Sequence, residues 1–240
     1  MALEPGLYVV ATHIGNPDDI TLRALKVLKE VDFVICEEFK MGSKLLRHYE
    51  IKKPLVNLNE HNEDEESLTL VQRLMINGES AAIISDAGTP LFADPGNNLV
   101  AQCHENGIKV VPVPGASSIM TALMASGLEL DKFLYYGFLP ANKVERQSAL
   151  RSLPNQYDLI FLEAPYRLKQ FLADMKKILG KNRQAIIAYK LTQPTEQIFW
   201  GTLEELVTMT AELPKGEFVF ILKKVIRYGN KHGHSKKKKS

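Results

Sequence analysis

The sequence predicts an α/β fold of two domains, because short apolar runs alternate with amphipathic helical patterns in both halves of the chain. The apolar runs of the first half carry too few polar residues for half-exposed antiparallel strands, so they indicate a mostly parallel, buried sheet. The predicted strands there are 7–11, 32–36, 55–58, 80–84 and 108–113, and the helices are 19–30, 42–49, 63–77 and 97–106.

The second half restarts the alternation after Pro112, Pro114 and Gly115 interrupt it. Its predicted strands are 133–138, 157–162, 184–190 and 217–224, and its helices are 117–126, 143–152, 165–179 and 202–210. We therefore expect two α/β domains with mixed sheets, 1–114 and 115–228, and a ligand cleft between them at strand C-terminal ends.

The helix predicted at 63–77 has the most complete end signals. Asn62 is expected to cap it, Glu65 completes the spacing of a capping box, and Gly78 can end it.

Composition indicates a globular protein of the cytoplasm. Hydrophobic residues make up 45% and charged residues 24% of the 240 residues, with no apolar run long enough to cross a membrane and no basic leader. Cys36 and Cys103 are expected to be buried free thiols, and the six scattered histidines predict no metal site.

The charge is unevenly distributed. The segment 229–240 holds five lysines and no acid, so the net charge of +2 becomes −3 for residues 1–228. Such a composition cannot form a core, and we expect a disordered basic tail that either contacts RNA or is only a solvated end.

Four loops that follow predicted strands carry the candidate chemistry: 11–16, 85–96, 113–118 and 162–167. In the second loop, Gly88 and Gly96 permit positive φ angles or close approach, while prolines stiffen the path. Asp86 and Asp94 stand near its ends, so the loop predicts a preorganised pocket. The alternative is that both aspartates only cap turns.

The third loop places Ser117 and Ser118 at a helix start, where hydroxyl and N–H groups can receive a polar ligand. Ordinary helix capping is the alternative for one serine. Nicotinamide, P-loop, serine-hydrolase and zinc-protease motifs are absent from the sequence. The residues alone thus indicate a two-domain α/β enzyme with a small-molecule cleft.

Several motifs resemble, in order and spacing, the bacterial 16S rRNA cytidine 2′-O-ribose methyltransferases of the tetrapyrrole methylase-like superfamily. They are Leu7-Tyr-Val-Val-Ala-Thr-His-Ile-Gly-Asn16, Ser85-Asp-Ala-Gly-Thr-Pro90, Asp94-Pro-Gly96, Val113-Pro-Gly115, Gly137-Phe-Leu-Pro140 and Gly216-Glu-Phe218. The resemblance covers roughly 6–224. It implies a homodimer that binds S-adenosylmethionine in an interdomain cleft and methylates a cytidine ribose in 16S ribosomal RNA of the small subunit.

The resemblance also implies site residues. The cofactor is expected to contact Ile14, Gly15, Asp86, Ala87, Gly88, Thr89, Ser118, Ile119, Leu162, Ala188 and Glu217. The acceptor side is expected to include Lys40 and Arg167. Candidates for a general base are Glu37, Glu38, His61 and Glu163.

Plain structural roles compete with these assignments. Glu38 can pair with Lys40, and His61 can help to cap the following helix. The sequence departs from the family pattern at residues 13, 38–40, 166 and 189–193, where it has, for example, Lys40 in place of arginine. Two other functions stay open: a sibling enzyme acting on a tetrapyrrole or another small molecule, and a non-catalytic RNA-binding or ribosome-assembly protein.

Overall fold

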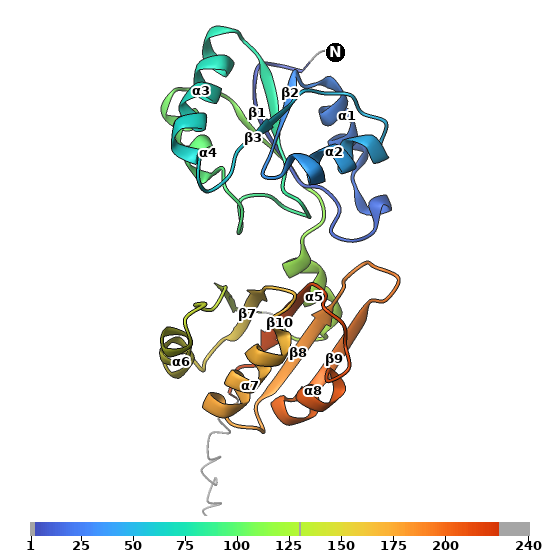
Figure 1. The fold of residues 1–240 in the computed structure, drawn as a ribbon, viewed down its shortest axis with the longest axis vertical. Coiled ribbons are helices and arrows are strands. Elements are labelled where there is room, and N and C mark those ends of the chain that lie inside the picture. The colour runs from blue at the N-terminus through green and yellow to red at the C-terminus, as the bar shows by residue number, and fades with distance from the viewer. Residues whose placement is uncertain (1–2, 130, 226–240) are drawn as a thin grey trace, which may run out of the picture. The chain divides into compact units, whose positions relative to one another are not determined.

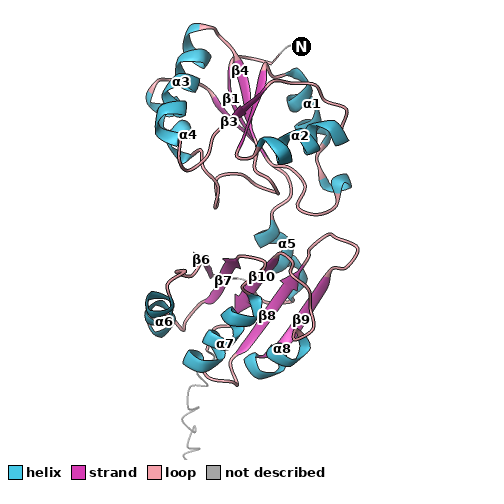
Figure 2. Cartoon of the chain, viewed as in Figure 1, coloured by secondary structure: helices cyan, strands magenta, loops and turns pink. Residues whose placement is uncertain are grey.

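The computed structural model describes residues 3–129 and 131–225, and its elements alternate as predicted (Figures 1 and 2). The predicted basic tail lies outside the described residues. The chain forms two compact units: Met1–Leu128 with Ala188–Ile198 and Gly216–Val219, and Glu129–Ile187 with Phe199–Lys215 and Phe220–Ser240. The predicted domain limits at 114 and 228 stay a prediction.

The first unit is built on a five-stranded sheet in the order β3-β2-β4-β1-β5. Its strands are β1 (Gly6–Val10), β2 (Phe33–Cys36), β3 (Leu55–Asn57), β4 (Ser80–Ile83) and β5 (Val110–Val113). Every neighbouring pair is parallel, with Leu7 opposite both Ala81 and Val110. The mostly parallel sheet predicted from the apolar runs is confirmed.

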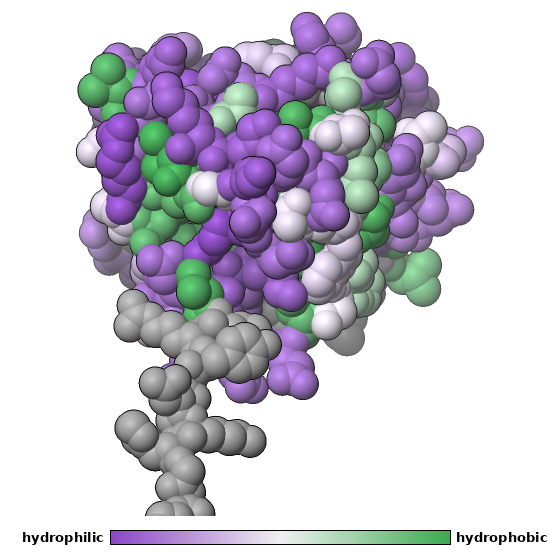
Figure 3. Space-filling model, turned by 90° about the horizontal axis from the view of Figure 1, so that it is seen from below, coloured by the Kyte–Doolittle hydropathy of each residue, from purple (hydrophilic) through white to green (hydrophobic). Residues whose placement is uncertain are grey.

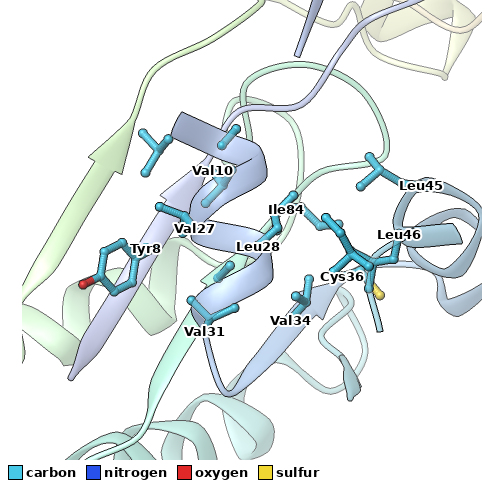
Figure 4. Packing of buried hydrophobic residues seen from close by; sticks show 14 residues of the cluster. Tyr8, Val10, Val27, Leu28, Val31, Val34, Cys36, Leu45, Leu46 and Ile84 are labelled. Atoms are coloured by element: carbon cyan, nitrogen blue, oxygen red, sulfur yellow. The ribbon is translucent and has the colours of Figure 1, made fainter. Parts of the chain in front are cut away.

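Helices cover both faces of this sheet. On one face, α1 (Leu22–Glu30) and α2 (Phe39–His48) pack their buried residues against Val10, Val34 and Ile84, as the close view shows (Figure 4). On the other, α3 (Glu63–Ile76) and α4 (Asn97–Glu105) pack against alternate strand residues such as Leu7 and Ile35. Each fully buried aliphatic side chain contributes about 1.5–3 kcal/mol, which stabilises the packing of helices on both faces of the sheet.

The topology reverses between β1 and β4. The chain leaves β1 through the short 3-10 helix η1 (Pro17–Asp19) and α1, passing to β2 on one side, whereas it leaves β4 through α4, passing to β5 on the other. In open α/β sheets, ligands bind outside the carboxyl ends of strands at such a switch point. The loops after β1 and β4 therefore occupy the expected binding position.

The helix predicted after Asn62 is present, but the predicted capping bond of Asn62 is wrong. Asn62 stands at the start of α3, but its side chain makes no capping bond. Its Nδ2 donates to the Asn57 carbonyl at 3.2 Å and its Oδ1 accepts from the Asn59 amide at 2.7 Å, so asparagines in the preceding loop compete for it. A complete capping box occurs instead at Thr202 and Glu205.

The second sheet has the order β6-β7-β10-β8-β9. Its strands are β6 (Phe133–Gly137), β7 (Asp158–Glu163), β8 (Gln184–Tyr189), β9 (Gln197–Thr202) and β10 (Phe218–Leu222). The helices of this half are α5 (Ser118–Ser126), α6 (Lys143–Arg151), α7 (Leu168–Leu179) and α8 (Leu203–Met209). The prediction missed β9, an edge strand without a buried residue, because it lacks the apolar run that marked the others.

The second unit has an aromatic core and a buried ion pair. Phe171 lies between Phe161 and Phe220, with ring centroids 6.0 Å and 4.9 Å away. Arg146 of α6 donates to Asp174 of α7 at 2.9 Å, and both side chains are nearly inaccessible to solvent.

The predicted state of the cysteines is confirmed: Cys36 and Cys103 are free and buried, and burial raises the pKa of each to about 11. Within the described part of the chain, no helix combines the length and apolar character needed to cross a membrane.

Candidate functional site

The loops after β1 and β4 are joined by a pair of backbone hydrogen bonds. The Thr12 amide donates to the Gly88 carbonyl at 2.9 Å, and the Gly88 amide donates to the His13 carbonyl at 3.0 Å. Gly88 has φ +78°, and a Cβ there would lie 2.7 Å from Cγ2 of Ile14. Only glycine fits this crossing without strain, which confirms the positive φ and close approach predicted for Gly88. The positive φ predicted for Gly96 is also confirmed, at +119°.

The third loop is bonded to the other two. The Thr89 hydroxyl donates to the Ala116 carbonyl at 2.9 Å, and the Ala11 amide donates to the Val113 carbonyl at 3.1 Å. The Ser117 side chain caps α5, as the alternative of ordinary helix capping predicted. Within the described part of the chain, the Ser118 hydroxyl makes no hydrogen bond. The three loops therefore form one bonded cradle beside a helix N-terminus.

A fourth segment, distant in sequence, completes this cradle. The Asn16 amide donates to Oγ1 of Thr192 at 2.8 Å, and a Cβ on Gly15 would lie only 2.6 Å from the Leu191 carbonyl oxygen. Lys190 and Thr192 have positive φ angles of 48° and 63°, which non-glycine residues rarely adopt. Sequence reasoning missed Thr192, which was not among the predicted site residues.

The segment that contains Thr192 also contacts Glu217, another residue predicted to contact the cofactor. The Lys190 amide donates to the Glu217 carbonyl at 2.8 Å. Ala188 lies in the same segment of the first unit, so the predicted cofactor residues other than Leu162 all belong to this unit.

His13 stands where the family pattern has proline. Its Nδ1 lies 3.1 Å from the Tyr49 hydroxyl, which donates its single proton to the Pro17 carbonyl at 2.7 Å. Nδ1 must then carry the proton of the first bond. Burial, and secondarily the nearby His48, lower the pKa of His13, which favours the neutral ring. The substitution thus adds a link between the first loop and the end of α2.

Carboxylates gather where β2 and β4 end. Burial raises the pKa of Glu37, and the negative charges of Asp94 and Asp86 raise it further. Burial likewise raises the pKa of Asp86, with Glu38 and Asp94 adding to the effect. Between the strand ends, Glu37 and Asp94 lie beside apolar residues such as Ile35 and Ile83. A proton is therefore held more tightly here than on an exposed carboxylate.

Asp94 makes hydrogen bonds within its loop, as the structural alternative for the two aspartates predicted. Burial raises the pKa of Asp94, while hydrogen bonds from the Ser85 side chain and the Leu91 backbone oppose that shift, so Asp94 does shape the loop. The loop end is fixed further by Glu63, whose Oε1 accepts from the Gly96 amide at 2.8 Å.

Three other predicted site residues, Glu38, Lys40 and His61, are exposed to solvent. Glu38 precedes α2 without a side-chain capping bond, and Lys40 lies in its first turn. The proposed Glu38–Lys40 ion pair does not occur among the ion pairs of the described chain. The His61 amide donates to Oδ1 of Asn59 at 2.9 Å, so its backbone belongs to an asparagine turn and not to a helix cap.

The second unit holds the remaining candidates. Leu162 is partly buried in β7. The next residue, Glu163, is buried and pairs with Arg167 at 3.0 Å. Arg167 also donates to the Pro140 carbonyl at 3.3 Å. Within residues 3–129 and 131–225, Oε2 of Glu163 has no hydrogen-bond partner. This buried oxygen therefore has capacity for one further donor.

The doubly wound parallel sheet, its bonded glycine loops and a second five-stranded sheet define an α/β protein with a candidate ligand site at the switch point of the first sheet. The family model of tetrapyrrole (corrin/porphyrin) methylases matches residues 6–207, and the chain belongs to this family. The predicted fold class and the predicted enzymatic nature are confirmed.

Relatives place the chain more finely and bear out the resemblance drawn from its motifs. It is 44% identical over 220 residues to "Ribosomal RNA small subunit methyltransferase I" of Haemophilus influenzae, covering 90% of this chain and 77% of the relative. It is 45% identical to the protein of that name from Pseudomonas aeruginosa, covering 90% and 78%.

Solved structures show the same fold at low identity. Uroporphyrin-III-C-methyltransferase from Thermus thermophilus has a TM-score of 0.64 at 21% identity, with 92% of this chain and 94% of that chain covered. Diphthine synthase has a TM-score of 0.69 at 18% identity, with 92% and 91% covered.

Proposed function

We propose that the protein transfers a methyl group from S-adenosylmethionine to the ribose 2′-hydroxyl of a cytidine in 16S ribosomal RNA, within small ribosomal subunits in the cytoplasm. The observation that carries this proposal is the identity of 44% over 90% of the chain to proteins named as small-subunit rRNA methyltransferases. The bonded loop cradle supplies the physical support.

The cradle suits a compact, zwitterionic and partly apolar cofactor. Gly15 and Gly88 let the loops pack closely against Leu191 and Ile14, which fixes the cradle, and the Ser118 hydroxyl adds a donor at the N-terminus of α5. Asp86 offers a carboxylate to an amino group, and the side chain of Ile119 offers an apolar contact. When bound, S-adenosylmethionine supplies an electrophilic methyl group on a sulfonium.

We assign the proton transfer to Glu37. A ribose hydroxyl is a weak nucleophile, and a carboxylate whose pKa is raised by burial accepts its proton more readily than an exposed one. Glu38, His61 and Glu163 stay candidates for the same step. Lys40 is assigned to a phosphate of the acceptor strand, and Arg167, paired with Glu163, to the acceptor side.

We further propose a homodimer. Met120 and Met124 of α5 are 58% and 80% exposed, and Figure 3 shows further apolar patches among hydrophilic residues on one face of the molecule. Large apolar side chains left in water favour burial against a second copy. Sedimentation of the wild type and of Met124→Lys tests this: the variant should shift toward monomer, and a wild-type monomer would contradict it.

The decisive experiment incubates the protein with labelled S-adenosylmethionine and small subunits from cells that lack the gene. We expect label on one ribose of the RNA. Glu37→Gln should lower the transfer rate about 100-fold or more while cofactor affinity, measured by calorimetry, stays unchanged. The exposed Glu65→Gln in α3 is the matched control.

Three results would contradict parts of the proposal. Label only on a tetrapyrrole would move the acceptor to a small molecule. Tight RNA binding without any transfer would indicate a non-catalytic RNA-binding protein. Full activity of Glu37→Gln would move the proton transfer to another candidate.

A further inference from the structure

A basic groove lies in the first unit, on the side of α2 that faces the edge strand β3. Its volume is about 740 Å³. The residues that line it are Ser43, Leu46, Arg47, Glu50, Ile51, Lys52, Lys53 and Leu55. Cationic side chains thus surround an aliphatic floor, away from the loop cradle.

The cations of this groove are not neutralised by the protein itself. Within the described residues, Arg47, Lys52 and Lys53 form no ion pair, and Glu50 is the one acid in the lining. Lys53 does lower the pKa of Asp32, but less than the hydrogen bonds from Ser80. Because residues 1–228 carry a net charge of −3, the groove is a local exception in an acidic body.

The groove owes its shape to the way α2 ends. The Ile51 amide donates to the Leu46 carbonyl at 2.8 Å, and the Glu50 amide donates to the Arg47 carbonyl at 3.1 Å. Glu50 sits between them in the left-handed region with φ 56°, a position that glycine usually takes. This turn brings Lys52 and Lys53 back alongside Arg47.

The charge continues along the helix toward the candidate site. Lys40, Lys44 and Arg47 follow the spacing of one helix face, and all three are exposed. α2 begins directly after Glu37 and Glu38. With ten residues, the helix spans about 15 Å, which corresponds to a few nucleotides of RNA.

We propose that this groove, continued by Lys40 and Lys44, binds the sugar-phosphate backbone of the substrate RNA a few nucleotides from the methylated ribose. The inference rests on the proposed function. Arg47 can bind a phosphate in bidentate fashion, and the lysines supply point charges. Among the described residues that line the groove none is aromatic, so it positions the backbone without stacking bases.

The test compares two triple variants of equal charge change. Arg47→Gln/Lys52→Gln/Lys53→Gln removes the groove cations, whereas Arg151→Gln/Lys177→Gln/Lys181→Gln removes one arginine and two lysines from exposed positions of the second unit. The measurements are affinity for small-subunit RNA at several salt concentrations, cofactor affinity and the methylated position. Thermal melting verifies that both variants are folded.

We expect the groove variant to bind RNA at least 30-fold more weakly at low salt. The slope of log affinity against log salt should fall by about two to three units, because each phosphate contact contributes about 0.7–0.9. Cofactor affinity and the methylated position should stay unchanged, and the control variant should behave as the wild type. Arg47→Lys should keep most of the slope.

An unchanged slope in the groove variant, with methylation by the wild type intact, would overturn this inference and leave the proposed function standing. A wild type that neither binds nor methylates the RNA would instead overturn the proposed function. Competition by polyglutamate as strong as that by RNA would assign the groove to an acidic protein and also overturn the inference.

Discussion

The hydroxyl of Thr89 donates a hydrogen bond to the carbonyl of Ala116 at 2.9 Å, which ties the loop after β4 to the start of α5. Thr89→Val keeps the shape of the side chain and removes this bond. A lost hydrogen bond costs about 1 kcal/mol, so cofactor affinity measured by calorimetry should fall about fivefold.

Thr69→Val is the matched control, because the Thr69 hydroxyl donates to the Glu65 carbonyl at 3.3 Å on α3, outside the loops. It should leave cofactor affinity unchanged. If Thr89→Val also bound the cofactor normally, the third loop would have no part in the site.

The raised pKa of Glu37 predicts how stability depends on pH. A carboxyl whose pKa is higher in the folded than in the unfolded chain binds its proton more tightly when folded. The contribution of Glu37 to stability is therefore present at low pH and is lost as the pH rises through the pKa of the folded state. Glu37→Gln should thus gain stability over the wild type between about pH 4 and neutral pH, as measured by urea unfolding.

The pKa of Glu79 shifts in the opposite direction, so Glu79 serves as the internal control. The hydrogen bond from Arg73, at 2.9 Å, lowers its pKa, so its contribution is present above the unfolded pKa and is lost as the pH falls through the folded value. Glu79→Gln should destabilise the protein at neutral pH and become neutral in acid. If the free energy of unfolding changed with pH in the same way in both variants and in the wild type, this account would be wrong.

Glu50 occupies a left-handed position that glycine tolerates better. Glu50→Gly should therefore stabilise the protein by up to about 1 kcal/mol and raise the melting midpoint by about 2–4 °C. It also removes the acid from the basic groove, so RNA affinity should rise. Glu50→Ala separates the effects: it should raise RNA affinity without raising the melting midpoint.

The buried pair of Arg146 and Asp174 predicts a large effect from a single change. Asp174→Leu leaves a buried guanidinium without its carboxylate and should cost about 3–5 kcal/mol in urea unfolding. Arg146→Met/Asp174→Leu should cost less, because no charge is left unpaired. A double variant as unstable as the sum of its singles would show that the carbonyls of Pro140 and Ala141, which accept from Arg146, dominate.

Patterns in the sequence predicted the regular part of the fold well. Buried apolar runs predicted all five strands of the first sheet, because a strand covered on both faces must be apolar throughout. Patterning failed at β9, an edge strand without a buried residue, and at Asn62, whose side chain bonds to the preceding loop. Side-chain competition of this kind depends on loop geometry that no periodicity encodes.

The candidate site was predictable where glycine and proline mark unusual backbone. Gly88 predicted a positive φ or a close approach of the backbone, and the structure shows it where the loops after β1 and β4 meet. Thr192 carried no such signal, because its positive φ goes with contacts to Asn16, far away in the chain, and to Glu196 nearby, which no glycine or proline marks. The raised pKa of Glu37 was equally hidden, since it arises first from burial and then from carboxylates on three separate segments.

The bond between Asn16 and Thr192 sets an order of events during synthesis. These residues are 176 positions apart, so the first loop emerges from the ribosome long before its partner exists. At about 5–20 residues per second, a nascent chain can complete the parallel sheet many seconds before the returning segment reaches Gly15. The loop cradle therefore becomes able to bind the cofactor only late in maturation, after most of the polypeptide has been made.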